Sequence, residues 1–366
     1  MVGLRGIPDI QGGIEKHCQE LYPILAGLGF HVTILARDPY TQNFAYDYKG
    51  VCVRPIWAPR KQNLEAITHT LYALIKIRFF SHKYDIVHIH GIGPGLLTGL
   101  AKLFGFKVVV TNHGPDYDRA KWGRIAKSVL RLGEKVSSLF ADYIVSVSRN
   151  ICANLEKNYH RDAIYIPNGI HVINPVPPGP ILKRLSLKRR KYILAVGRLV
   201  PEKGFHDLIE AYKRIDTLGW QLVIAGDADH KSQYSRNLLS KAEKTSGVVM
   251  AGFCNRETLN ELYSNAGLFV LPSYHEGLPL VGLEALSFQV RCLFSDIPAN
   301  KEIAMPFELF SPGDVEDLSD KIRDIISNPM IFNKPINDNN RCHRINTEFK
   351  WDNIAIQTAK VYLSLL

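Results

Sequence analysis

The sequence predicts an α/β protein with two doubly wound, parallel-sheet domains. Short apolar runs typical of buried strands alternate with amphipathic helical segments along the whole chain. The alternation is interrupted once, by a proline-rich and then basic stretch over residues 174–191. At 366 residues the chain is long enough for two full cores. We therefore expect four parts: a first domain over 1–172, a linker over 173–190, a second domain over 191–348 and a final helix over 349–366.

The first half begins with an unusually short strand. Met1 to Leu4 is shorter than a typical strand, although the first strand of such a domain is normally central. We expect that Met1 lies within the true first strand. A helix follows at Ile14 to Gly29, and segments 64–80 and 95–104 also have helical spacing. The expected strands are His31–Ala36, Val51–Trp57, Asp85–His90, Lys107–Thr111, Tyr143–Val147 and Ala163–Ile166.

The second half repeats the alternation. Its expected strands are Tyr192–Val196, Gln221–Ala225, Val248–Gly252, Leu268–Leu271 and Arg291–Ser295. The last helix, Trp351 to Leu365, places Ile354, Val361 and Leu365 on one side. Ligands of such sheets bind beyond the carboxyl ends of the strands. Site residues are therefore sought in the loops that follow strands.

Composition excludes several classes of protein. No apolar run reaches the roughly 18 to 20 residues of a membrane helix, and the N-terminus lacks the apolar stretch of a signal peptide, so we expect a cytoplasmic protein. The six cysteines are scattered without a Cys-x-x-Cys pair, which predicts neither disulfides nor a zinc site. No nucleic-acid recognition motif is present, and we expect no nucleic-acid partner.

The net charge of +10 is concentrated in the first half. Residues 1–175 contain 21 Lys and Arg against 13 Asp and Glu. Two segments, 74–83 and 118–135, carry much of this charge; in the second, Lys127, Arg131 and Lys135 recur at helical spacing beside the apolar residues Trp122, Ile125, Val129 and Leu132. Either a solvated helix or a peripheral docking surface for anionic lipid fits this pattern.

The stretch LPSYHEGLPLVGLEALS, residues 271–287, combines groups that suit a nucleotide sugar. It follows an apolar strand and contains Pro279, a residue favoured where a helix begins. Glu276 lies in the loop and Glu284 within the expected helix. The backbone amides of Gly277 and Leu278 stand near a helix N-terminus, which is a common site for phosphate. Carboxylates for sugar hydroxyls and amides for phosphate therefore share one loop.

A second stretch, YILAVGRLVPEKG, residues 192–204, offers two cations. Arg198 and Lys203 lie between Gly197 and Gly204 on a loop after a buried strand. This arrangement suits a diphosphate leaving group, although each cation alone would be read as a surface charge.

Together these stretches resemble glycosyltransferase family 4, whose members have the two-domain GT-B architecture. The resemblance rests on VGRLVPEKG, LVIAGD, HEGLPLVGLEAL and SDIPANKE, which occur in this order at residues 196–204, 222–227, 275–286 and 295–302. It covers almost the whole chain. The resemblance implies a retaining transferase that uses a nucleotide-diphosphate sugar, and a last helix that packs back on the first domain.

The resemblance also assigns residues of the first domain. Gly12 and Gly13 open the first helix and would face the donor diphosphate and the acceptor. His113, at a strand end, would face the transferred sugar, whereas His90 is interpreted as structural. Related sequences often carry an acid after the Asn168-Gly169-Ile170 turn, and this chain has His171 there. That difference weakens a ligand role for the turn.

The roles that follow are these. Arg198 and Lys203 neutralise the diphosphate, helped by the Gly277–Pro279 segment and the Gly12–Gly13 helix; Glu284 binds ribose, and Glu276 and His113 act at the sugar. No Asp-x-Asp motif occurs, so we expect no metal and no cofactor. The expected partners are a nucleotide-sugar donor, a glycan or polyprenyl-linked acceptor of bacterial surface polysaccharide, and an anionic membrane surface.

Two alternatives remain open. An epimerase or a pyridoxal phosphate-dependent phosphorylase would use the same two-domain fold. A basic protein that binds a lipid surface or nucleic acid, with a decayed sugar site, belongs to another class. Acceptor dependence and a cofactor absorbance scan separate the enzymes, and retention of Arg198, Lys203, Glu276 and Glu284 together argues against decay.

Overall fold

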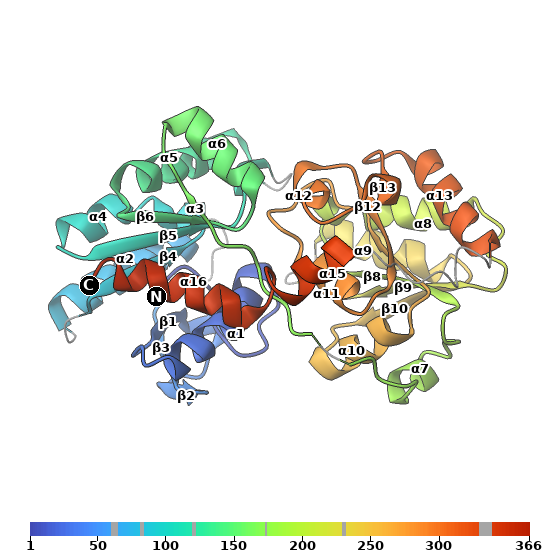
Figure 1. Cartoon of the computed structure of the whole chain (residues 1–366), viewed down its shortest axis with the longest axis horizontal. Coiled ribbons are helices and arrows are strands. Elements are labelled where there is room, and N and C mark those ends of the chain that lie inside the picture. The colour runs from blue at the N-terminus through green and yellow to red at the C-terminus, as the bar shows by residue number, and fades with distance from the viewer. Residues whose placement is uncertain (60–64, 81–83, 119–121, 173, 229–231, 329–338) are drawn as a thin grey trace. The chain divides into compact units, whose positions relative to one another are not determined.

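The chain folds into two units, each with its own parallel sheet and core (Figure 1). Unit 1 contains residues 1–169 and 349–366, and unit 2 contains residues 170–348. The structure, a computed structural model, describes residues 1–59, 65–80, 84–118, 122–172, 174–228, 232–328 and 339–366. Of the basic segments expected from the sequence, Lys83, Arg119 and Lys121 lie outside these ranges, as does residue 173 at the start of the expected linker.

The strands of unit 1 form two ladders, β2-β3-β1 and β4-β5-β6-β7. All pairs are parallel except β2 with β3. Val2 bridges in parallel to Ile89, and Met1 accepts a hydrogen bond from the amide of Leu35, so the first two residues lie between the ladders. The strands are β1 (Thr33–Arg37), β2 (Tyr46–Tyr48), β3 (Val51–Ile56), β4 (Ile86–His90), β5 (Lys107–Asn112), β6 (Tyr143–Ser146) and β7 (Ile164–Tyr165).

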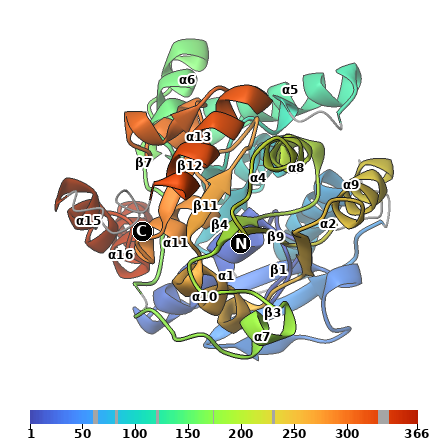
Figure 2. The ribbon, with the colours of Figure 1, turned by 90° about the vertical axis from the view of Figure 1, so that its right-hand side faces the viewer.

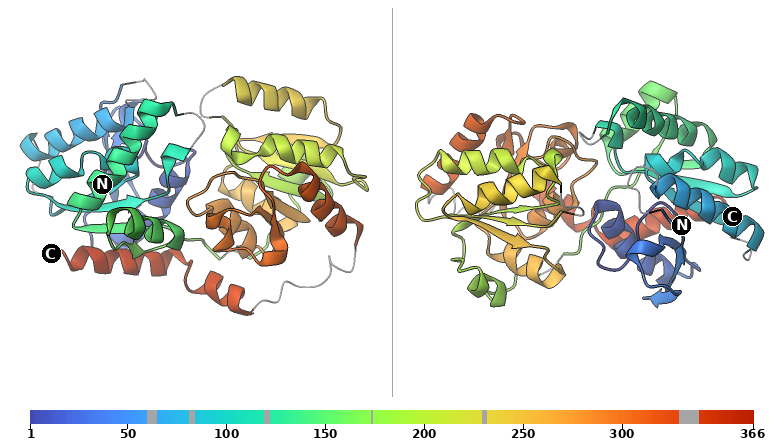
Figure 3. Two further views of the ribbon diagram at one scale, coloured as in Figure 1. Left: turned by 90° about the horizontal axis from the view of Figure 1, so that it is seen from above. Right: turned by 180° about the vertical axis from the view of Figure 1, so that it is seen from behind.

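Helices cover both faces of this sheet (Figures 1 and 3). They are α1 (Gly13–Gly27), η1 (Asp38–Tyr40), α2 (Glu65–Phe80), α3 (Ile92–Gly95), α4 (Thr98–Leu103), η2 (Asp116–Asp118), α5 (Arg124–Phe140), α6 (Arg149–Tyr159) and α16 (Trp351–Leu363). The single helix expected over 95–104 is two short helices, because the chain turns at Leu96 and Leu97.

Unit 2 contains one six-stranded parallel sheet in the order β10-β9-β8-β11-β12-β13. The chain runs outward from β8 to β10 and then resumes on the other side of β8 with β11. The topological switch point of this sheet therefore lies between β8 and β11. The strands are β8 (Tyr192–Val196), β9 (Gln221–Ala225), β10 (Val248–Gly252), β11 (Leu268–Leu271), β12 (Arg291–Ser295) and β13 (Leu309–Phe310).

Helices also flank the sheet of unit 2 (Figure 2). They are α7 (Pro180–Arg184), η3 (Pro201–Lys203), α8 (Phe205–Lys213), α9 (Gln233–Glu243), α10 (Arg256–Asn265), α11 (Leu280–Ser287), α12 (Pro298–Lys301), η4 (Pro306–Glu308), α13 (Val315–Ser327) and α15 (Asn339–Asn346). One core cluster joins Leu208 of α8, Leu238 of α9 and Ile322 of α13 to β8 and β9. Burial on both faces explains why β8 and β11 are continuous apolar runs.

The segment expected to be an exposed linker is part of unit 2. Glu261 of α10 accepts hydrogen bonds from the backbone amides of Gly179 and Leu182, at 2.8 and 3.0 Å. Ile181 and Leu182 of α7 are buried. The expectation of an exposed hinge over 173–190 was therefore wrong for α7, because one carboxylate from a distant helix anchors the backbone of this short helix.

The last helix, α16, packs on α1 within unit 1 (Figure 3). Trp351 begins this helix, is buried, and lies 5.4 Å from the ring of His17. A Cβ atom at Gly169 would overlap the Trp351 indole, so glycine is required there. Separately, within the described ranges no helix is both long and apolar enough to cross a membrane.

Candidate active site

The loop after β8, residues 197–204, approaches the loop after β11, residues 272–279. Gly204 has φ +65°, and a Cβ atom there would overlap the carbonyl oxygen of Pro272. Only glycine permits this conformation and this approach without strain. The backbone amide of Tyr274 donates to the carbonyl of Glu202 at 2.9 Å, which fastens the two loops. We call them the β8 loop and the β11 loop.

The two loops are joined by an ion pair between Lys203 and Glu276. Lys203 Nζ donates to Glu276 Oε1 at 2.6 Å, and Ser273 Oγ donates to the same oxygen at 2.6 Å. Both charged side chains are largely buried. Burial alone would raise the pKa of Glu276, but the Lys203 charge and hydrogen bond, with the Ser273 hydroxyl, hold that pKa below its usual range. Glu276 is therefore ionised at neutral pH.

This pairing changes the interpretation of two predicted site residues. Lys203 was expected to meet a phosphate and Glu276 a sugar, from separate loops. The structure brings them into direct contact, so the ammonium fixes the carboxylate at the sheet edge. Arg198 lies on the same β8 loop, half-buried. The sequence analysis did not identify Ser273, which completes the arrangement; a serine three residues before the glutamate was the available signal.

Helix α11 begins as the sequence predicted. Pro279 is its N-cap and Leu280 its first helical residue, and the amides of Gly282 and Leu283 donate to the Pro279 carbonyl. Leu278 is buried. Glu284 is half-buried on this helix and accepts a hydrogen bond from Tyr263 Oη at 3.2 Å. It thus lies at the start of the second turn of α11, the helix that the β11 loop leads into.

In unit 1, Gly12 and Gly13 occupy the start of α1 as expected. Gly12 is the N-cap, with φ +156°, and Gly13 is the first helical residue. A Cβ atom at Gly12 would overlap the Glu15 carboxylate. Glu15 pairs with Arg5 at 3.1 Å and is buried. Burial would raise the pKa of Glu15, and the Arg5 guanidinium lowers it to below its usual range. The sequence analysis missed this pair, which holds the glycine loop against α1.

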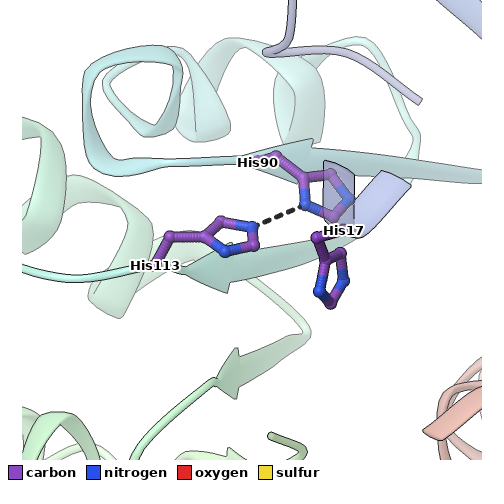
Figure 4. A group of neighbouring side chains, drawn as sticks. All are labelled: His17, His90 and His113. Carbon is purple, nitrogen blue, oxygen red and sulfur yellow. Dashed lines mark hydrogen bonds between the residues drawn. The ribbon is translucent and has the colours of Figure 1, made fainter. Parts of the chain in front are cut away.

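Three histidines meet at the strand ends of unit 1, and Figure 4 shows them together. We call His17, His90 and His113 the histidine cluster. His90 Nδ1 and His113 Nε2 lie 2.9 Å apart and share a hydrogen bond, and the His17 ring centroid is 5.0 Å from that of His113. His90 ends strand β4, His113 follows strand β5, and helix α1 supplies His17. The sequence analysis selected His113, assigned His90 a structural role and did not select His17.

Behind the cluster, a buried chain of hydrogen bonds extends to α16. Tyr22 Oη lies 2.6 Å from His90 Nε2 and 3.2 Å from His88 Nδ1, and Tyr362 Oη lies 2.5 Å from the same His88 atom. His17 Nδ1 bonds to Asn168 Oδ1 at 3.0 Å. Burial lowers the pKa of His17 to about 4 and places the pKa values of His88, His90 and His113 well below the ordinary value. These imidazoles are neutral at pH 7.

Comparison with known proteins agrees with this organisation. Residues 11–173 match the family model described as Glycosyltransferase Family 4, and residues 182–346 match that of Glycosyl transferases group 1. An uncharacterized glycosyltransferase of Methanocaldococcus jannaschii is 32% identical over 381 residues, which cover 97% of this chain and 95% of that protein.

Two further proteins carry more informative names. The UDP-Gal:alpha-D-GlcNAc-diphosphoundecaprenol alpha-1,3-galactosyltransferase of Escherichia coli is 29% identical over 319 residues, or 79% of this chain and 77% of that enzyme. The crystal structure of Anabaena HepE in complex with UDP-glucose superposes with a TM-score of 0.78 at 16% identity and covers 99% of both chains. The chain therefore belongs to glycosyltransferase family 4 and has the GT-B fold.

Proposed function

We propose that this chain transfers a sugar from a nucleoside-diphosphate sugar, with retention of anomeric configuration, to a polyprenyl-linked glycan acceptor of bacterial surface polysaccharide. The single observation that carries the proposal is the Lys203–Glu276 pair, which joins two loops at the switch point of unit 2. A crevice at such a point is where α/β sheets bind their ligands. The pair offers a cation and a carboxylate together, the two groups that a nucleotide sugar requires.

The chemical problem is the departure of a nucleoside diphosphate as positive charge develops at the anomeric carbon. In our proposal Arg198 and Lys203 stabilise the charge on the diphosphate, and the amides at the start of α11 add hydrogen bonds. Glu284 binds the ribose hydroxyls. Because two cations already neutralise the leaving group, the proposed reaction does not depend on a metal ion.

Glu276 and His113 are the residues that we assign to the transferred sugar. Glu276, held ionised by Lys203, accepts hydrogen bonds from sugar hydroxyls. His113, kept neutral by burial, is able both to donate and to accept. A neutral imidazole also avoids adding positive charge next to the developing cation at the anomeric carbon. Retention follows if the acceptor attacks from the face that the diphosphate leaves, with a phosphate oxygen taking the acceptor proton.

The acceptor proposal is supported by one relative and one surface. The Escherichia coli relative is named for a diphosphoundecaprenol-linked acceptor. In this chain, α5 exposes Ile125, Leu132 and Leu139 at seven-residue intervals, with Arg131 and Lys135 also exposed. The sequence analysis placed Ile125 and Leu132 on an apolar stripe, and both lie on the outer surface, because Leu130 and Glu134 occupy the inner face. Exposed apolar and basic groups on one helix fit an anionic membrane surface.

Liposome binding tests the membrane part separately. Sedimentation of the protein with vesicles that contain anionic lipid would support the membrane surface. The sedimented fraction should fall severalfold in the double variant Arg131→Glu/Lys135→Glu. Absence of sedimentation at low salt would remove the membrane surface from the proposal and leave the transferase reaction standing.

The donor is tested by thermal shift and hydrolysis assays against UDP-, GDP- and dTDP-sugars, with and without a chelator. A ligand at about 100 times its dissociation constant stabilises the fold by about 2.7 kcal/mol, which is easily detected. We expect one nucleotide class to stabilise the protein, Arg198→Ala to abolish the shift, and the chelator to have no effect on turnover. No response to any nucleotide sugar in folded protein would overturn the proposal.

A further inference from the structure

The histidine cluster has the composition of a metal-binding site that the sequence did not predict. One ring nitrogen from each of His17, His90 and His113 lies within 4.8 Å of one from each of the other two. In the part of the chain that the structure describes, this is the one group of three or more potential ligands so arranged. No ligand spacing along the chain marks it, since the three residues come from α1, the end of β4 and the loop after β5.

In two of the three rings, those of His17 and His90, the nitrogen that does not face the cluster has a partner of the kind that metal-bound histidines use. His17 Nδ1 bonds to the amide oxygen of Asn168, which only accepts, so Nδ1 carries the proton and Nε2 carries the lone pair. His90 Nε2 bonds to Tyr22 Oη at 2.6 Å, which leaves Nδ1 for the cluster. Such outer hydrogen bonds fix the tautomer and the ring orientation of a metal ligand.

Metal binding at this site rearranges protons between ring nitrogens. Neutral imidazole, with one proton and one lone pair, is the form that ligates a metal. The proton now shared between His90 Nδ1 and His113 Nε2 would move to a nitrogen on the outer side of one ring. Each ring would then keep one proton and direct one lone pair inward.

The geometry requires modest side-chain movement. Zinc binds imidazole nitrogen at about 2.0–2.1 Å, so the ligand atoms of a tetrahedral site are roughly 3.3 Å apart. The His90 and His113 nitrogens, now 2.9 Å apart, would separate slightly, and His17 would turn toward them (Figure 4). Three protein ligands leave a fourth position of the ion for a water molecule or a substrate oxygen.

We propose that the histidine cluster binds one divalent transition-metal ion of the zinc class through His17, His90 and His113. The ion would ligate His113, the residue that the proposed reaction places at the sugar. Binding would therefore inhibit transfer rather than assist it. The binding itself does not depend on the proposed function.

The test is metal titration of the full chain after removal of metal with a chelator. We expect about one Zn²⁺ per chain by calorimetry, and visible absorption bands of four-coordinate Co²⁺ when Co²⁺ is the probe. His17→Ala should weaken binding at least tenfold, whereas His17→Cys, which restores a zinc ligand, should recover it. His31→Ala, at an exposed histidine of the same unit, is the matched control and should bind as the wild type does.

The outcomes separate the proposal from its rivals. Binding of less than half an ion by the wild type overturns the proposal and identifies the cluster as a hydrogen-bond network only. Equal binding by wild type and a folded His17→Ala, as judged by circular dichroism, places the ion elsewhere and also overturns it. If His17→Ala does not fold, Asn168→Ala provides the second variant, with binding weakened about tenfold at unchanged stoichiometry. Metal binding by a protein that shows no transferase activity even after removal of metal would leave this inference intact and count against the proposed function alone.

Discussion

Lys203 has a structural role in addition to the proposed catalytic one. It is largely buried against Glu276, so its removal leaves a carboxylate in a site with little water. We expect Lys203→Ala to lower turnover about 10²–10³-fold and the free energy of unfolding by about 3 kcal/mol. Arg198→Ala, on the same loop but outside this pair, should lose comparable activity with less loss of stability. Initial rates and urea unfolding measure both quantities.

A second substitution separates the two effects. In Lys203→Ala/Glu276→Gln the uncompensated charge is gone, so most of the stability should return while activity does not.

The pH dependence of the stability that this pair provides follows from the lowered pKa of Glu276. The pair stabilises the fold fully above the carboxyl's unfolded pKa of about 4.3, and this contribution is lost as pH falls through the lower folded value. Wild type and Lys203→Ala with equal stability at pH 7 would contradict the structural role.

His69 of α2 should make stability depend on pH independently of the Lys203–Glu276 pair. It is fully buried, and burial, with a smaller contribution from the Arg37 charge, lowers its pKa to about 3. The unfolded chain binds this proton near pH 6.5, so stability is lost as pH falls from 6.5 toward 3. When the pH falls from 7 to 5, the free energy of unfolding of His69→Leu should decrease by about 2 kcal/mol less than that of the wild type. Between pH 7 and 8 the two proteins should respond alike; equal losses at acid pH would refute the prediction.

At the scale of elements, two glycines of the predicted ligand loops should tolerate a side chain to different degrees. Gly204 combines a positive φ with contact to a backbone carbonyl, whereas Gly13 begins α1 and a Cβ atom added there would meet nothing within 4 Å. Gly204→Ala should destabilise the fold by about 3 kcal/mol or more. Gly13→Ala should leave stability unchanged or raise it by up to about 1 kcal/mol.

The Gly13→Ala variant also tests whether the start of α1 contacts the donor. If the donor phosphates approach Gly13 closely, as the sequence analysis expects, its alanine variant should raise the KM for the donor without a loss of stability. Thermal unfolding and donor titration of Gly13→Ala supply the two readouts. Unchanged KM in this variant would remove Gly13 from the donor site, and a stable Gly204→Ala would contradict the loop contact described above.

The sequence predicted elements well where burial is continuous. All five strands expected in the second half, including β8 and β11, have the predicted bounds. Strands β2 and β13, with three and two residues, were missed, since neither is long enough to show a periodic pattern. Pro279 located the start of α11 because its chemistry is local.

The site was predicted less completely because its contacts join distant parts of the chain. The Lys203–Glu276 contact spans 73 positions, and the His17–Asn168 contact spans 151. The residue types indicated what each group would bind, but nothing in either loop showed that the two charges pair. His17 stood in a helix with no motif around it, and only the packing of α1 beside β4 and β5 brings it to the cluster.

At the scale of the whole molecule, α16 makes unit 1 depend on the last part of the chain. Trp351 is buried against His17 and Gly169, so Trp351→Ala should lower the free energy of unfolding of unit 1 by about 3–5 kcal/mol. Ile356, on the same helix, is 47% exposed, and Ile356→Ala is the matched control, with a change within about 0.5 kcal/mol. Calorimetric unfolding compares the two, and similar losses for both variants would show that α16 does not stabilise unit 1 through Trp351.

The order of the units along the chain has a consequence for biosynthesis. Unit 2 is inserted between the body of unit 1 and its closing helix, so a ribosome must translate residues 170–348 before α16 exists. At about 5–20 residues per second this takes roughly 10–40 s, during which the α1 surface that α16 will cover stays open. The inserted unit can complete its sheet first. The unit that begins the chain is thus the later of the two to finish folding, and in that interval it is the part most exposed to chaperones and proteases.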